Sequence, residues 1–107
     1  HQIKEPKDTM SLSVSYRIAF SSILKLLTKQ YAKRQINCIN IAPGPIATDR
    51  LKSLVSDMKS LEDRLPMKRI GTVEELAKFV RAIVENDIKY LTGVTINFDG
   101  GHSTYVL

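Results

Sequence analysis

The sequence predicts an α/β fold in which two parallel strands are joined through helices, in the order helix, strand, helix, helix, strand. Residues 36–41 form a short run rich in β-branched side chains, which is typical of a strand buried on both faces. Residues 92–98 alternate apolar and polar side chains, which is typical of a strand. The helical patterns between the two runs imply a right-handed crossover and therefore parallel pairing.

A long amphipathic helix is expected before the first strand, from about Leu12 to about Lys33, after a polar loop over residues 1–11. Ser11 and Ser13 are its candidate N-caps. Its apolar side chains recur at steps of three and four residues, and six are expected on the inward face: Tyr16, Phe20, Ile23, Leu24, Leu27 and Tyr31. A flanking stripe is expected to meet a partner helix, such as one from another subunit: Ile18, Ser22 and Leu26.

The first predicted strand ends at Pro43, Gly44 and Pro45, because proline lacks a ladder N–H and glycine permits unusual backbone angles. Thr48 follows as the start of a short amphipathic helix over residues 49–60. Open α/β sheets place ligands at turns of this kind, where free N–H groups lie beyond the carboxyl end of a strand. We therefore expect a binding site at this turn.

An irregular connection is expected over residues 61–71, before the clearest local signal in the chain. Thr72 and Glu75 have the spacing of a capping box, in which each side chain accepts a hydrogen bond from the other residue's backbone N–H. The helix that they open is expected to end near Asn86, with four inward side chains: Leu76, Val80, Ile83 and Val84. The last strand then closes at residues 99–101, Asp-Gly-Gly.

Two parallel strands make a poor sheet alone, because both edges are exposed and little area is covered. We therefore expect residues 1–107 to form a single partial domain, with neighbouring strands supplied by another chain or by another part of the protein. The chain begins at His1 and its first methionine is Met10, which also suggests a fragment or a processed product.

Composition argues against several classes of site. The single cysteine, Cys38, excludes an internal disulfide and favours a reducing, cytoplasmic compartment. The two histidines, His1 and His102, lack the spacing of metal ligands, so no metal site is expected. No apolar run approaches the roughly 20 residues that a membrane span needs, so no membrane partner is expected.

The net charge of +5 is concentrated near the start of the chain, where Lys25, Lys29 and Lys33 fall on one stripe of the predicted helix. Such a stripe could attract nucleic acid or a phosphate-bearing cofactor. Aromatic residues do not interleave with it, so we interpret it as a solvated helix face and expect no nucleic-acid partner.

Four stretches in characteristic order carry a resemblance to a known family: residues 17–31, INCINIAPGPIATDR, RIGTVEELAKFV and YLTGVTINFDGG. Together they resemble the C-terminal half of a divergent short-chain dehydrogenase/reductase, a Rossmann-type family of NAD(P)-dependent oxidoreductases. They are similar, in turn, to its long active-site helix, its sixth strand with the following turn, its last helix and its closing strand. The resemblance implies the C-terminal part of a doubly wound parallel sheet, incomplete on its own.

The resemblance also implies a cofactor, NAD or NADP. By position, Pro43, Gly44, Pro45 and Ile46 would line the nicotinamide pocket, and Thr48 would hydrogen-bond the carboxamide or the pyrophosphate. The five glycines of the chain do not form the family's glycine-rich phosphate fingerprint, which follows the first strand in such folds.

The catalytic positions depart from the family pattern, which places a tyrosine and a lysine four residues apart on the long helix. Aligned here, the two positions hold Ser13 and Arg17. An aliphatic hydroxyl is a far weaker acid than a phenol, whose reference pKa is about 10. Arg17 can still hold the cofactor ribose, although a guanidinium does not exchange protons at ordinary pH. Tyr16 is a further candidate acid, but we expect it to pack in the core.

Two functions remain open at this point. The first is part of an oxidoreductase that transfers a hydride between a nicotinamide cofactor and a small carbonyl or alcohol substrate, with residues 46–65 in the substrate lid and with residues 1–107 inactive alone. The alternative is a family member that has lost its chemistry and acts as a binding or oligomerisation module. In either case we expect a homo-oligomer, dimer or tetramer.

Overall fold

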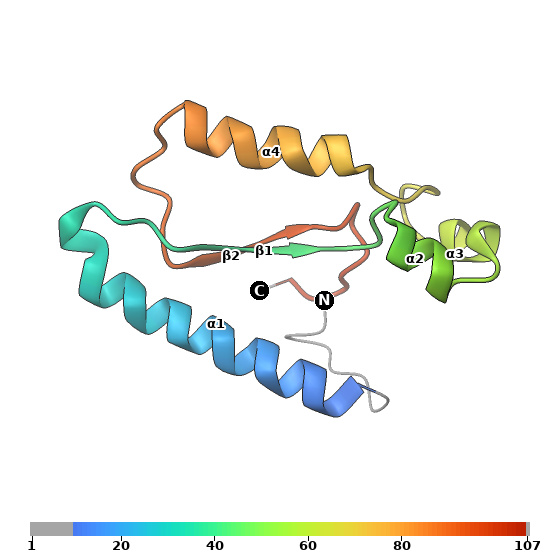
Figure 1. Cartoon of the computed structure of the whole chain (residues 1–107), viewed down its shortest axis with the longest axis horizontal. Coiled ribbons are helices and arrows are strands. Elements are labelled where there is room, and N and C mark those ends of the chain that lie inside the picture. Colours follow the sequence, from blue (N-terminus) through green and yellow to red (C-terminus); the bar gives the residue numbers. More distant parts are fainter. Residues whose placement is uncertain (1–9, 107) are drawn as a thin grey trace. The chain divides into compact units, whose positions relative to one another are not determined.

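The structure is a computed structural model that describes residues 10–106, and it confirms the α/β fold with a parallel sheet (Figure 1). Strands β1 and β2 pair with each other to form the two-stranded sheet. The elements, in chain order, are α1 (Ser11–Tyr31), the 3₁₀ helix η2 (Ala32–Arg34), β1 (Ile39–Pro43), α2 (Asp49–Leu54), α3 (Met58–Arg64), α4 (Val73–Glu85) and β2 (Val94–Phe98).

The chain divides into two compact units, each made of two segments. Of the described residues, 10–42 and 88–96 form the first unit, and 43–87 and 97–106 form the second. The loop expected over residues 1–9 lies outside the described residues. Among the helices that the structure describes, none is both long enough and apolar enough to cross a membrane.

In the first unit, helix α1 contacts β1 and the residue before β2 through polar side chains. The Asn40 Nδ2 group on β1 donates to the Ser21 Oγ at 3.2 Å. The Lys25 ammonium donates to the Gly93 carbonyl, just before β2, at 2.7 Å. Val14, which is 3% exposed, is the buried hydrophobic side chain of this helix. The strand-facing side of α1 therefore follows the register of Val14, Ser21 and Lys25.

The predicted inward face of α1 is wrong for most of its members. Tyr16 is 75% exposed and Phe20 is 57% exposed, and Ile23 and Leu27 are exposed as well. The helix has apolar residues on more than one side, so periodicity alone does not identify the side that packs. The expected serine cap is also wrong, because Met10 occupies the N-cap position and makes no side-chain capping bond.

Strand β1 begins at Ile39, three residues after the start of the predicted strand. Gln35, with a φ of 59°, ends the 3₁₀ helix in the left-handed region, and Ile36 is 50% exposed. The Cys38 N–H donates to the side-chain oxygen of Thr92 instead of to a ladder carbonyl. Residues 39–42 are half-buried in the described chain, in which β1 has one neighbouring strand. Burial on both faces depends on the further strands expected from outside this chain and stays a prediction.

Two short helices replace the single helix predicted over residues 49–60. Val55 adopts an extended conformation that ends α2, and the Asp57 carboxylate accepts from the Ser60 N–H at 2.9 Å to begin α3. Helix α3 continues to Arg64, inside the connection predicted as irregular. The side-chain cap at Asp57 supplies an acceptor for the new helix start and stabilises the break.

Helix α4 confirms the predicted capping box and both predicted helix ends to within one residue. Its inward side is only partly as expected, because Val80 and Val84 are exposed. The Phe79 ring instead packs inward and stacks on Phe98 of β2, with ring centroids 5.4 Å apart. The alternation predicted for β2 is confirmed: Val94, Ile96 and Phe98 are half-buried, whereas Thr95 and Asn97 are exposed.

Candidate functional site

The turn after β1 is held on one side by the end of β2. The Gly44 N–H donates to the Phe98 carbonyl at 3.0 Å. A Cβ atom on Gly44 would lie 2.8 Å from both the Cα and the Cβ of Asp99, closer than non-bonded carbons approach. Glycine is therefore required at this position because of the close approach of Asp99.

The other side of the turn is held by the chain just before α4. The Gly71 N–H donates to the Pro45 carbonyl, and the Ala47 N–H donates to the Gly71 carbonyl, each at 2.9 Å. Ile46 and Gly71 thus form an isolated parallel bridge. The turn is fixed by backbone hydrogen bonds from two segments that are far from it in sequence.

These bonds correct the expectation of a turn with several free N–H groups. The Thr48 N–H also has an acceptor, the Ile46 carbonyl at 2.7 Å. Among residues 10–106, the turn amide to which no acceptor is assigned is that of Ile46. One backbone donor of this turn therefore remains for an external acceptor.

Thr48 supplies a second hydrogen-bonding group at the same turn. Its Oγ1 accepts from the Leu51 N–H at 3.2 Å and caps α2, as the sequence predicts. A hydroxyl has one O–H donor in addition to its acceptor lone pairs. Thr48 is exposed, so its O–H can donate to a ligand while its oxygen caps the helix.

A cluster of charged residues orders the segment that contacts the turn. Arg69 and Glu75 form a bidentate pair, with Nη1–Oε2 and Nη2–Oε1 distances of 2.9 and 2.7 Å. The Glu75 carboxylate also accepts from the Thr72 N–H at 2.9 Å. Hydrogen bonds from Arg69 first and from the Thr72 backbone second lower the pKa of Glu75 from 4.5 to about 2. The same pairing raises the pKa of Arg69.

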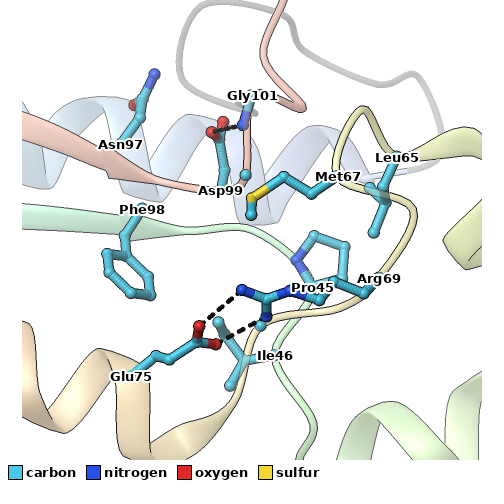
Figure 2. Close-up of a pocket in the computed structure, with 12 residues that line it drawn as sticks. Pro45, Ile46, Leu65, Met67, Arg69, Glu75, Asn97, Phe98, Asp99 and Gly101 are labelled. Carbon is cyan, nitrogen blue, oxygen red and sulfur yellow. Dashed lines mark hydrogen bonds and ion pairs between the residues drawn. The ribbon is translucent and has the colours of Figure 1, made fainter.

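A cavity of about 370 Å³ opens beside the turn within the second unit (Figure 2). The Arg69–Glu75 pair lies along one part of its lining, and Asp99 and Met67 lie along another. Apolar lining comes from both the turn and the neighbouring segments: Pro45, Ile46, Leu65, Met67 and Phe98. The volume lies within the range of about 300–1,000 Å³ that is usual for small-ligand sites.

Asp99 organises the chain that follows β2. Its carboxylate accepts from the N–H groups of Gly101 and Ser103, each at 3.0 Å, and from the Ser103 hydroxyl. Partial burial opposes ionisation of this carboxyl, but the hydrogen bonds from Ser103 and Gly101 outweigh it and lower the pKa of Asp99. Asp99 is thus an ionised acceptor with several donors.

The sequence-predicted site residues fall into two groups. Pro43, Gly44, Pro45, Ile46 and Thr48 lie together at the turn in the second unit. Ser13 and Arg17 lie in the first unit, one helical turn apart on α1, where Ser13 is half-buried and Arg17 is exposed.

Arg17 and Tyr16 point in different directions from α1. Arg17 lies one helical turn before Ser21, which contacts β1, so it lies toward the strand-facing side of the helix. Tyr16 shares the exposed register of Phe20, and the prediction that it packs in the core is wrong.

Sequence reasoning missed Arg69 and Asp99 as residues of this region. The spacing of Thr72 and Glu75 predicts the capping box. The pairing of Glu75 with Arg69 depends on how the chain turns before the helix, which the spacing does not show. The Asp-Gly-Gly ending marked a turn, and a carboxylate two residues before a glycine N–H was a signal for an Asx-type bond.

The chain as a whole is similar to several known proteins. A family profile described as enoyl-(acyl carrier protein) reductase matches residues 9–103. A glucose 1-dehydrogenase of Gluconobacter oxydans is 33% identical over 98% of the chain. The NADPH-dependent reductase BacG of Bacillus subtilis is 34% identical over 92% of the chain. The aligned regions cover 40% and 42% of these two proteins, so the chain spans less than half of their length.

The fold is similar to that of solved reductases. The crystal structure of YwfH, an NADPH-dependent reductase involved in bacilysin biosynthesis, matches 99% of the chain with a TM-score of 0.92 and 28% identity. The match covers 45% of that structure. The described fold therefore corresponds to slightly less than half of a complete reductase subunit.

Proposed function

Because the chain belongs to the short-chain dehydrogenase/reductase family, we propose that it is part of an NAD(P)-dependent oxidoreductase that transfers a hydride between a nicotinamide cofactor and a small carbonyl or alcohol substrate. Relatives named as dehydrogenases and reductases support this reaction class. We propose that residues 1–107 are inactive alone, because their five glycines supply no phosphate fingerprint for the rest of the cofactor.

The observation that carries the proposal is the turn amide of Ile46. The amide lies in a turn that two backbone segments hold rigidly, and it has no acceptor among the described residues. A carboxamide oxygen is a suitable acceptor for this N–H, and the Thr48 hydroxyl adds a second donor nearby in sequence. We therefore assign the nicotinamide end of the cofactor to this turn, lined by Pro43, Gly44 and Pro45.

Nicotinamide supplies or accepts the hydride when bound, and the residues of the chain bind and orient it. We assign Arg17 to the cofactor ribose, because its guanidinium is permanently charged and offers several N–H donors. We assign Ser13 to the position of the family's acid, where its hydroxyl can donate a hydrogen bond but is too weak an acid to replace a phenol fully. Arg17 lies one helical turn before Ser21, whose hydroxyl accepts a hydrogen bond from Asn40 of β1.

The segment from Ile46 to Leu65 is proposed as part of a substrate lid. It contains α2 and α3, which are two short helices joined by an extended break. Short helices on a connection of this kind can move as a unit over a ligand. Leu65, 3% exposed, anchors the end of this segment in the second unit.

Titration of the full-length protein with NADH and with NADPH tests the proposal. Binding is expected to quench or shift the nicotinamide fluorescence, and one cofactor is expected to bind more tightly than the other. The Thr48→Val variant is expected to bind more weakly, whereas Thr48→Ser retains the hydroxyl and is the matched control. Absence of binding by both cofactors would contradict the proposed function.

The second candidate is a family member that has lost its chemistry and serves as a binding or oligomerisation module. The replacement of the family's tyrosine and lysine by Ser13 and Arg17 favours it. So does the exposure of the flanking stripe of α1, in which Ile18 is 40% and Leu26 is 63% exposed. Turnover that survives Ser13→Ala and Tyr16→Phe but not Arg17→Ala would favour a rearranged enzyme instead.

For either function we propose a homo-oligomer, dimer or tetramer, in the cytoplasm. Cys38 is unpaired with another cysteine and half-buried, which suits a reducing compartment. The proposed partners are a small-molecule substrate and further copies of the chain. We propose no nucleic-acid partner, because the lysine stripe has no interleaved aromatic residues and its Lys25 already donates to the Gly93 carbonyl.

A further inference from the structure

We propose that Asp99 is a positioning residue for the turn at residues 43–48, acting through its own backbone on Gly44. This inference rests on the proposed function, because it assigns to Asp99 the task of placing the Ile46 N–H for the cofactor. Asp99 itself makes no contact with the cofactor in this proposal.

Hydrogen bonds and two left-handed glycines fix the conformation of Asp99 and the residues after it. Gly100 and Gly101 have φ values of 60° and 79°, which lie in the left-handed region. The Asp99 carboxylate closes this turn by accepting from Gly101 and Ser103, and the His102 N–H donates to the Asp99 carbonyl at 3.2 Å. The side chain thus determines where the backbone of its own residue lies.

The backbone of Asp99 packs against Gly44. The space that a Cβ would need on Gly44 is filled by the Asp99 Cα and Cβ at 2.8 Å and by its carbonyl oxygen at 3.2 Å. These are mainly backbone atoms and cannot move aside as the end of a flexible side chain can. The Asp99 backbone therefore packs closely against Gly44, which is hydrogen-bonded to the neighbouring Phe98 carbonyl.

Gly44 lies in the same turn as the N–H donor of the site, which belongs to Ile46. Ile46 lies two residues further on, and its bridge to Gly71 holds the opposite side of the same turn. With Gly71 on one side and Asp99 on the other, the Ile46 N–H has a fixed direction. Loss of the Asp99 side is expected to leave the turn attached but mobile, so cofactor binding weakens before the fold is lost.

The experiment compares Asp99→Ala with Asn37→Ala in the full-length protein. Asn37 is a matched control because its side chain also bonds distant backbone, donating to the Ile88 and Lys89 carbonyls at 3.1 and 3.0 Å. Asp99→Ala is expected to raise amide hydrogen exchange at Gly44 and Ala47 about tenfold without cofactor and to weaken NADH or NADPH binding about tenfold. Asn37→Ala is expected to lower the melting temperature but to change neither quantity.

Two milder variants keep the test decisive if Asp99→Ala does not fold. Asp99→Asn retains a carbonyl acceptor, so it is expected to recover binding to within about threefold of the unmodified protein. Ser103→Ala removes one donor to Asp99 and is expected to weaken binding about threefold, with no further loss when combined with Asp99→Ala.

Unchanged exchange at Gly44 and Ala47 in Asp99→Ala would overturn the inference. Raised exchange with unchanged cofactor affinity would also overturn it, because the turn would then be displaced without consequence for the site. If the unmodified protein binds neither cofactor, the proposed function fails. The cofactor role of Asp99 then falls with it, while the exchange data still report whether Asp99 fixes the turn.

Discussion

The turn at residues 43–48 and the outward face of α1 differ in what holds their residues in place. The turn is bonded to Phe98 on one side and to Gly71 on the other, all within the second unit. The outward face of α1 is a row of exposed apolar side chains: Leu12, Tyr16, Phe20, Ile23 and Leu27. The turn is complete among the described residues, whereas the face has the character of a surface that a partner covers.

The difference shows which local signals depend on distant parts of a protein. Proline and glycine fix backbone geometry at their own positions, and the bonds that complete the turn come from segments within the chain. An apolar helix face buries itself only against another element, and the long helix carries more apolar sides than two strands can cover.

Gly44→Ala is the most severe test of the turn. The added methyl would lie 2.8 Å from backbone carbon of Asp99, so the turn must shift. The free energy of unfolding is expected to fall by about 2 kcal/mol, and cofactor affinity by about a hundredfold. Chemical denaturation and cofactor titration measure the two effects.

Gly71→Ala is the matched control, because its methyl would meet only the end of the Ile46 side chain at 2.7 Å, with the Pro45 carbonyl at 3.7 Å. That side chain can rotate away, so the loss is expected to be less than half as large. Equal losses for the two glycines would contradict the view that the Asp99 side of the turn is the rigid one.

Leu26→Asp tests whether the flanking stripe of α1 is the contact between copies of the chain. A carboxylate at an apolar contact between copies leaves a buried charge unpaired, so the dimer or tetramer is expected to dissociate to the monomer. Light scattering with size-exclusion chromatography gives the mass. Ala82→Asp introduces the same side chain on an exposed part of a different helix, α4, and is expected to retain the oligomer. An unchanged mass for Leu26→Asp would place the interface elsewhere.

The two regions also differ in how far the sequence predicts them. The Thr72–Glu75 capping box and the alternation of β2 are local patterns, and both were predicted correctly. The break near Val55 depends on one side-chain cap, at Asp57, within an otherwise helical pattern. The packed side of α1 was predicted wrongly, because Ser21 faces β1 through a hydrogen bond that hydrophobic periodicity does not register.

The candidate site shows the same division. The turn residues Pro43 to Thr48 were predicted from the prolines and glycine that end the strand and from the family resemblance. They lie together in the second unit. The contacts that fix them were not predictable, because Phe98 and Gly71 are brought to the turn only by the folded chain. The Arg69–Glu75 pair spans six residues around a bend and has no helical or strand spacing.

Thr48→Val tests a smaller contribution, which is the cap of α2. Loss of the oxygen that accepts from the Leu51 N–H is expected to lower the free energy of unfolding by about 1 kcal/mol. Thr48→Ser keeps the acceptor and is expected to stay within about 0.5 kcal/mol of the unmodified protein. Thermal unfolding distinguishes the two, and a stable Thr48→Val protein would show that the cap is dispensable.

The smallest expected effect is a pH dependence of stability that originates at Glu75. Its pKa is about 2 in the folded chain and 4.5 ordinarily, so the unfolded chain binds a proton at this position first as the pH falls. The stabilisation is therefore complete above pH 4.5 and is lost as the pH falls from 4.5 to about 2. Thermal unfolding across this range is expected to show a shallower decline of the melting temperature in Glu75→Gln than in the unmodified protein.

Glu85→Gln is the matched control, because it removes the carboxylate of an exposed ion pair with Arg81 on the same helix. Its melting temperature is expected to decline with pH as that of the unmodified protein does. If all three proteins declined in parallel, the Arg69–Glu75 pair would not be the acid-sensitive link that orders the segment beneath the turn.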